Sequence, residues 1–227
     1  MTQHFQREIE KLKRKLLELS AVVEESVANA VKAVLNHDAA LAQTVIASDN
    51  DIDNREVELE EDCLKILALH QPVAIDLRFI VAVLKINNDL ERIGDLAVNI
   101  AERLLVLHTT ESVDVPGRIQ KMTALVQQML KASLDALVNL DADTAQSVRQ
   151  GDDEVDRLNR EVFERLKERM ADDPTSIDEC LQLLGVSRHL ERIADHTTNI
   201  AEDILYMIDG RIVRHYGGDR EETPAAG

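Results

Sequence analysis

Acidic side chains recur in one stretch of the sequence at the spacing of a single helix face. With about 100° of rotation per residue, Glu91, Asp95, Asn99 and Glu102 fall within a narrow sector of a helix. Aliphatic residues such as Ile93 fall on the opposite side of that helix. Three carboxylates and an amide on one face could ligate a metal ion, since hard cations prefer oxygen ligands.

The same four residue types recur in the second half of the chain, at Glu191, Asp195, Asn199 and Glu202. Each of these stretches is preceded by two aspartates one helical turn apart, at Asp49, Asp53, Asp152 and Asp156. If neighbouring helices pack antiparallel, the aspartates can meet the acids of the following helix. Clustered carboxylates must take up protons, recruit arginine or lysine, or bind a cation.

We therefore predict a metal centre in each half of the chain. Its expected ligands are Asp49, Asp53, Glu91, Asp95, Asn99, Asp152, Asp156, Glu191, Asp195 and Asn199. Oxygen ligation favours Mg²⁺, Ca²⁺, Mn²⁺ or iron, with zinc as a further candidate. The spacing does not choose among these metals.

The competing interpretation is an ordinary solvated acidic surface. Charged residues make up 30% of the chain, so acids four positions apart arise freely, and Arg92 and Arg192 could pair with them. His189 and His196 have no histidine counterparts in the first half, so we expect surface or interface histidines, with His189 a less favoured ligand. No nucleophile motif or phosphate-binding loop is present, and no catalytic residue is predicted.

Hydrophobic residues recur at helical spacing nearly throughout, which predicts an all-α protein. Asp38 is a suitable N-cap for the second helix, and Pro72 suits the first turn of the third. The polar segment His108–Gly117 is the expected linker. The six expected helices span about residues 9–35, 38–69, 72–107, 118–139, 141–171 and 175–208.

The two halves of the sequence are a tandem duplication. Residues 88–105 and 188–205 are identical at ten of 18 positions, and the preceding helices align at an offset of 103. Short loops make successive helices antiparallel, so each half is predicted to be a three-helix bundle. The expected domains are residues 1–109 and 110–227, the second ending in a polar tail.

Composition excludes several classes of protein. The net charge of −17 and the 2% aromatic content argue against binding to nucleic acid. Few glycines, prolines and aromatic residues argue against a β-sandwich. No apolar run reaches the roughly 20 residues of a membrane span, and Cys63 and Cys180 form no disulfide framework. We expect a cytoplasmic protein in which both cysteines are buried.

Several of these segments together resemble one family. The segment Gln71–Arg78 (QPVAIDLR), the LERIGD sequence at 90–95, the LERIAD sequence at 190–195 and the tail HYGGD at 215–219 closely resemble PhoU proteins. The resemblance covers essentially the whole chain. In the second half Ala194 replaces Gly94, and Gln71–Arg78 has no clear second copy, so the halves need not bind alike.

The resemblance implies a fold and a function beyond what the spacing shows. PhoU proteins are two three-helix bundles, often homodimeric, that negatively regulate the phosphate-starvation response and phosphate uptake. The resemblance implies partnership with the phosphate importer's ATPase PstB and the sensor kinase PhoR, and metal on the acidic motifs. The alternatives are a metal-dependent hydrolase or oxidase acting on phosphate compounds, and a metal-free helical scaffold.

Overall fold

The computed structural model describes residues 3–106 and 117–209, which fold into six long α-helices and one 3-10 turn. The helices are α1 (Gln3–Asn36), α2 (Ala39–His70), α3 (Ala74–Val106), α4 (Gly117–Asn139), α5 (Ala142–Asp172) and α6 (Ile177–Asp209). The turn η1 (Pro174–Ser176) precedes α6. The prediction of an all-α duplication of a three-helix unit is confirmed.

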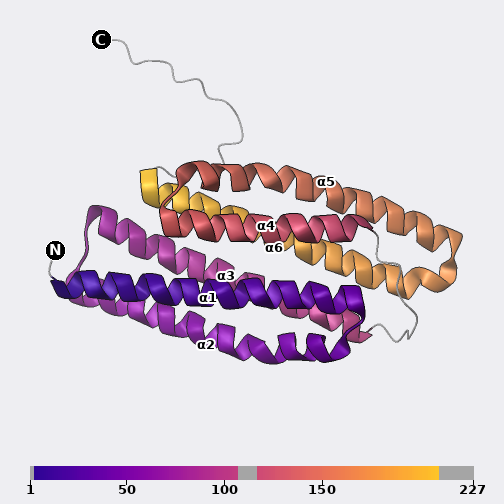
Figure 1. Cartoon of the computed structure of the whole chain (residues 1–227), viewed down its shortest axis with the longest axis horizontal. Helices are drawn as coiled ribbons and strands as arrows, with labels where there is room; N and C mark the ends of the chain where they lie inside the picture. The colour runs from indigo at the N-terminus through magenta and orange to yellow at the C-terminus, as the bar shows by residue number, and fades with distance from the viewer. Residues whose placement is uncertain (1–2, 107–116, 210–227) are drawn as a thin grey trace, which may run out of the picture.

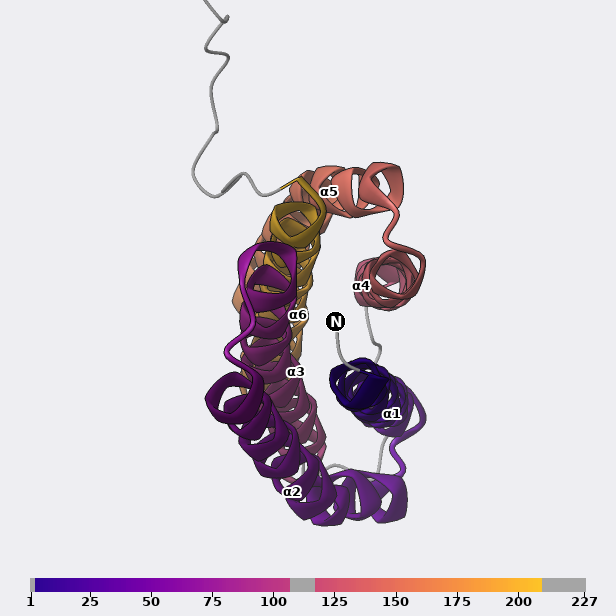
Figure 2. The ribbon, with the colours of Figure 1, turned by 90° about the vertical axis from the view of Figure 1, so that its left-hand side faces the viewer.

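The two three-helix bundles lie side by side along their length (Figure 1). Helices α3 and α6 pack against each other, and α1 contacts α4 more sparsely. The end-on view shows α2, α3, α6 and α5 as one curved layer, with α1 and α4 on its concave side (Figure 2). The two layers place the helices that carry the acidic motifs, α3 and α6, at the centre of the molecule.

Aliphatic stripes hold each bundle together. The predicted stripe of α1 is buried, with Leu12, Leu19 and Val27 at most 1% exposed. Cys63 and Cys180 are free thiols in the hydrophobic core, as expected. Few rings are needed because long aliphatic side chains at positions three and four apart fill the space between helices.

The first turn of each bundle repeats in detail. His37 and Leu140, equivalent in the repeat, both adopt the left-handed conformation at φ 54° and 52°. The next residues cap the following helices: Asp38 accepts a hydrogen bond from the Leu41 amide, and Asp141 accepts one from the Thr144 amide. The cap predicted at Asp38 is confirmed, and Asp141, predicted only as the start of its helix, caps α5 in the same way.

Several helix boundaries differ from the prediction. Helix α6 begins at Ile177, two residues after the expected start, because Pro174–Ser176 form η1. Helix α1 begins at Gln3, six residues before the expected start, because Phe5 is also buried. Pro72 lies before α3, since Gln71 ends α2 in a left-handed conformation and α3 begins only at Ala74. Gly117 belongs to α4 rather than to the linker, and the rest of the linker and the 109/110 boundary lie outside the described residues.

A polar contact also repeats between the second and third helix of each bundle. Asn87 donates to the Glu56 side chain at 3.0 Å, and Ser187 donates to Asn159 at 2.6 Å. These are equivalent positions in the two halves. No helix in the described parts of the chain has the length and apolar character needed to cross a membrane.

Candidate metal centres

The predicted acids of the first half lie on the adjacent helices α2 and α3, where their charges reach one another. Burial raises the pKa of Asp49, and the nearby charges of Asp53, Asp95 and Glu102 raise it further. Burial likewise raises the pKa of Glu91, with Asp95 as the largest charge contribution. These mutual effects place the carboxylates of α2 and α3 within electrostatic reach of one another across the helix pair.

The second half repeats this arrangement on α5 and α6 more strongly. Burial, followed by the charges of Asp195 and Asp156, raises the pKa of Asp152 to about 6. The pKa values of Glu191 and Asp195 are also raised, by burial first and then by neighbouring carboxylates. We refer to Asp49, Asp53, Glu91 and Asp95 as the first acidic cluster, and to Asp152, Asp156, Glu191 and Asp195 as the second.

One acid joins the first cluster that sequence reasoning did not select. Burial, followed by the charges of Glu60 and Asp53, raises the pKa of Glu56, and the charge of Glu56 in turn adds to the raised pKa of Glu91. Its position, three residues after Asp53, places it on the same face of α2 and could have revealed it. Its equivalent in the second half is Asn159, so a search for acids matched in both halves does not find it. The second half has an extra acid at a different place, since Asp153, whose first-half equivalent is Asn50, adds its charge near Asp152.

The two predicted asparagine ligands use their amide nitrogens elsewhere. Asn99 donates to the backbone oxygen of Asp95 at 2.8 Å, within its own helix. Asn199 donates to Asp89 of α3 at 3.4 Å, across the boundary between the bundles. Because a metal would take the amide oxygen, these bonds restrict the orientation of each side chain but do not use the ligating atom.

The chemistry of the donor set fits an oxygen-preferring cation. Asp49 Oδ1 and Glu91 Oε2 are buried oxygens without a hydrogen-bond donor, which is costly for a carboxylate. Arg92 offsets part of the charge, since its Nε lies 3.4 Å from Glu91 Oε2 and its Nη1 lies 3.5 Å from Asp95. Within residues 3–106 and 117–209, no three acidic, histidine or cysteine side chains already converge as a metal-ligand set.

The two histidines of α6 lie at the α3–α6 interface. His196 Nδ1 is 2.8 Å from Asp89 Oδ1, which makes it an interface histidine, one of the two roles expected for it. Both ring nitrogens of His189 are buried without a hydrogen-bond partner. Burial, followed by the charges of Arg103, Arg192 and Arg188, lowers the pKa of His189 to about 4. Its charged neighbours are thus arginines.

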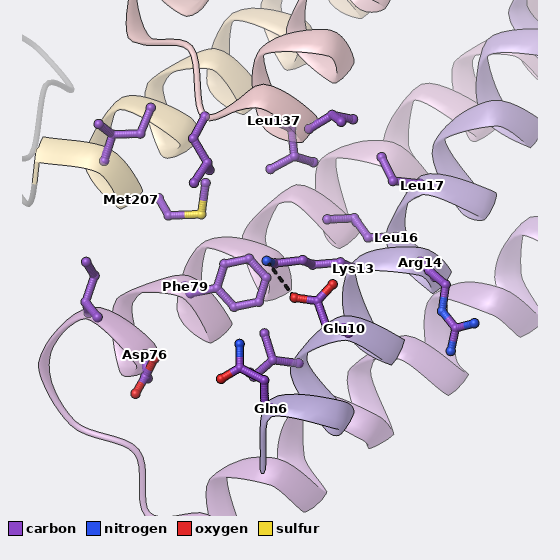
Figure 3. A pocket seen from close by; sticks show the side chains of 15 residues that line it. Gln6, Glu10, Lys13, Arg14, Leu16, Leu17, Asp76, Phe79, Leu137 and Met207 are labelled. Carbon is purple, nitrogen blue, oxygen red and sulfur yellow. Dashed lines mark hydrogen bonds and ion pairs between the residues drawn. The ribbon is translucent and has the colours of Figure 1, made fainter. Parts of the chain in front are cut away.

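A separate cavity of about 650 Å³ opens between the bundles (Figure 3). Phe79, Leu137 and Met207 form part of its apolar wall, while Glu10 and Lys13 pair at 3.2 Å on the α1 side. The predicted metal ligands are not among the side chains that line this cavity. The acidic clusters and the cavity are therefore distinct features of the molecule.

The sequence matches one family over both halves. The model of the PhoU domain matches residues 16–104 and again residues 119–204. The Phosphate-specific transport system accessory protein PhoU homolog of Pseudomonas aeruginosa is 39% identical, over 96% of this chain and 90% of that protein. The homolog of the same name from Caulobacter vibrioides is 39% identical, over 92% of this chain and 94% of that protein.

Solved structures agree with these matches. The crystal structure of PhoU from Pseudomonas aeruginosa has a TM-score of 0.88 at 39% identity, covering 91% of this chain and all of that one. The phosphate transport system regulatory protein PhoU from Streptococcus pneumoniae has a TM-score of 0.86 at 31% identity, covering 92% of this chain and 99% of that one. The similarity extends over the whole fold.

Proposed function

Because this chain belongs to the PhoU family, we propose that it is an accessory protein of a phosphate-specific transport system. It acts as a cytoplasmic adaptor that lowers phosphate uptake and the phosphate-starvation response. Its partners are the importer ATPase PstB and the sensor kinase PhoR. The single observation that carries this proposal is the duplicated PhoU domain with matched acidic clusters on α2–α3 and α5–α6.

An exposed apolar surface supports the adaptor role. At the junction of α2 and α3, Leu69 and Val73 are 76% and 74% exposed, and Ile75 is also exposed. Three large apolar side chains at one end of a helix pair form a surface that a protein partner could cover. The junction contains the Gln71–Arg78 segment, which has no clear copy in the second half.

The metal has a structural role in this proposal. Asp49, Asp53, Glu91 and Asp95 would hold it in the first half, and Asp152, Asp156, Glu191 and Asp195 in the second. A bound cation supplies positive charge to carboxylates whose pKa values burial and mutual repulsion have raised. The acids of each helix pair would then be held together rather than repelled.

The partner assignment is tested by affinity capture of PstB and PhoR from membranes under phosphate-replete conditions. We expect both to be recovered with the wild-type protein, and Val73→Glu to reduce recovery. Val57→Glu is the matched control, since Val57 is exposed elsewhere on α2. If the wild-type protein recovers neither PstB nor PhoR, the adaptor proposal is wrong. Light scattering of the same samples tests the expected homodimer.

The metal is tested by elemental analysis of protein purified without chelators. We expect multivalent ions in the wild-type protein, and a loss of about half in Glu91→Ala with Asp95→Ala. The equivalent pair, Glu191→Ala with Asp195→Ala, assigns the second cluster. An unchanged metal content after mutation of all four acids would remove metal binding from the proposal.

A further inference from the structure

The interface between α3 and α6 has two ends that the repeat makes equivalent, but only one of them is electrically balanced. At the first end, Lys85 Nζ lies 3.1 Å from Asp203, and Asp89 lies 2.8 Å from His196. Residues 100 positions apart are equivalent in α3 and α6. The second end therefore consists of the equivalents of these four residues: Gly185, Arg103, His189 and Leu96.

At the second end a cation replaces an anion without an opposing charge. Arg103 stands where the first end has Asp203, and Gly185 stands where it has Lys85. Arg103 Nη1 donates to the neutral amide oxygen of Gln182 at 3.3 Å. A Cβ atom on Gly185 would lie 2.7 Å from Arg103 Nε, so the guanidinium lies directly against the glycine. The absence of a side chain at residue 185 thus leaves room for the Arg103 guanidinium.

Two further arginines, Arg188 and Arg192, contribute positive charge near His189. The charges of Arg103, Arg192 and Arg188 all reach the ring of His189. The first-half equivalent of Arg192 is Arg92, which forms ion pairs with Glu91 and Asp95. Among the ion pairs of the described residues, Arg192, Arg188 and Arg103 have no carboxylate partner within 4.0 Å. The repeat thus pairs its arginine in one half but not in the other.

The His189 ring is a buried polar group within electrostatic reach of the three arginines. Both nitrogens of the His189 ring are inaccessible to solvent and lack a hydrogen-bond partner. Such atoms are costly in a folded protein unless a ligand or water satisfies them. In either neutral tautomer one ring nitrogen carries a hydrogen and can donate to an oxygen. A group with several anionic oxygens would satisfy His189 and balance the arginines together.

We propose that Arg103, Arg188, His189 and Arg192 bind a phosphate oxyanion at this end of the α3–α6 interface. Planar guanidinium groups form paired hydrogen bonds with phosphate oxygens, which explains the preference for a multivalent oxyanion over chloride. Inorganic phosphate and the phosphates of a nucleotide share this chemistry. Arg188 and Arg192 also lie within electrostatic reach of Glu191 and Asp195, so the site adjoins the second acidic cluster. It does not require the partners proposed above.

The experiment is titration calorimetry on chelator-treated protein at constant ionic strength, with inorganic phosphate in one arm and adenosine diphosphate in the other. We expect saturable binding in at least one arm, and the tighter ligand identifies the source of the phosphate. Arg103→Gln should weaken that binding by about tenfold or more, the effect of one lost charge-assisted hydrogen bond. Arg192→Gln should also weaken that binding. Its repeat-equivalent control, Arg92→Gln, should change the dissociation constant less than about twofold.

A second variant separates loss of binding from loss of fold. Gly185→Ala keeps every charge but forces Arg103 away from α6, so binding should weaken while the helical circular dichroism signal is retained. The proposal is overturned if the wild-type protein shows no saturable binding in either arm, since the arginines would then only balance Glu191 and Asp195. It is also overturned if Arg92→Gln weakens binding as much as Arg103→Gln, or if phosphate binds only after metal is restored.

Discussion

His196 of α6 and Asp89 of α3 form a hydrogen bond of 2.8 Å that joins the two halves of the duplication. The bond has no copy, because the equivalent of His196 is Leu96 and the equivalent of Asp89 is His189. Asp89 is only 8% exposed, so this contact lies inside the interface. Two bundles of common origin therefore pack together through contacts that differ at the two ends.

Loss of this bond should destabilise the protein. We expect His196→Ala to lower the free energy of unfolding by about 1–3 kcal/mol, because the buried Asp89 carboxylate loses its shorter hydrogen bond. Urea denaturation measures the change. A double-mutant cycle with Asp89→Asn should give a coupling energy of at least about 0.5 kcal/mol, and strictly additive effects would argue against the contact.

Asp152 should make stability fall as the pH rises. Its pKa is about 6 in the folded protein against a reference value of 3.8, so the folded state binds more protons between these values. The free energy of unfolding of chelator-treated protein should therefore decline from about pH 4 to pH 6 and remain lower above that range. Other titrating groups add their own slopes, so the contribution is read from the difference between variants.

The matched variants for this measurement are Asp152→Asn and Asp135→Asn. Asp135 is exposed on α4, outside both acidic clusters. Asp152→Asn should remove the decline and stabilise the metal-free protein at pH 7, whereas Asp135→Asn should leave the decline in place. Mn²⁺ should also stabilise the wild-type protein. At 100 times its dissociation constant it should raise the free energy of unfolding by about 2.7 kcal/mol. Equal pH profiles for the two variants would show that the pKa of Asp152 is not raised in the folded protein.

The replacement of Gly94 by Ala194 between the halves is a packing exchange. A Cβ on Gly94 would lie 3.1 Å from Ile52 Cδ1, which leaves little room for a methyl group. The equivalent of Ile52 in the second half is Val155, one methyl smaller. The pair Gly with Ile in one half thus corresponds to Ala with Val in the other, which is a reason for the sequence difference independent of metal binding.

This exchange can be tested by coupled substitutions. Gly94→Ala gains helix propensity of about 1 kcal/mol but crowds Ile52, so its net effect on the free energy of unfolding should be small or unfavourable. Adding Ile52→Val should relieve the crowding, with a favourable coupling of about 1 kcal/mol in thermal or urea denaturation. A coupling near zero would mean that Ile52 moves aside without cost.

The two thiols should be unreactive in the native protein. Cys63 and Cys180 are completely buried, and burial raises the pKa of Cys63 to about 12. Since only the thiolate is nucleophilic, a disulfide reagent at pH 8 should label neither cysteine until the protein unfolds, and then both. Rapid labelling of one cysteine under native conditions would place it outside the core. Cys63→Ala and Cys180→Ala identify which thiol reacts.

Local periodicity was sufficient to predict much of the structure of this protein. The stripe of α1, the cap Asp38 and the acidic face that begins at Glu91 all follow from residues within a few helical turns, and the structure contains them. The repeat added the second bundle because equivalent sequences bury equivalent stripes. Glu56 was missed for the opposite reason, since its equivalent is Asn159 and symmetry does not hold at that position.

Only the tertiary structure decided how the charges of the two halves are matched. Whether Lys85 meets Asp203, or Arg103 meets only an amide and a glycine, depends on how α3 and α6 cross. Helix spacing defines which residues share a face, but it contains no information about the register between helices about 100 residues apart. The sequence therefore determined the helices, the duplication and the acidic faces, while packing determined which charges are balanced and which remain for a ligand.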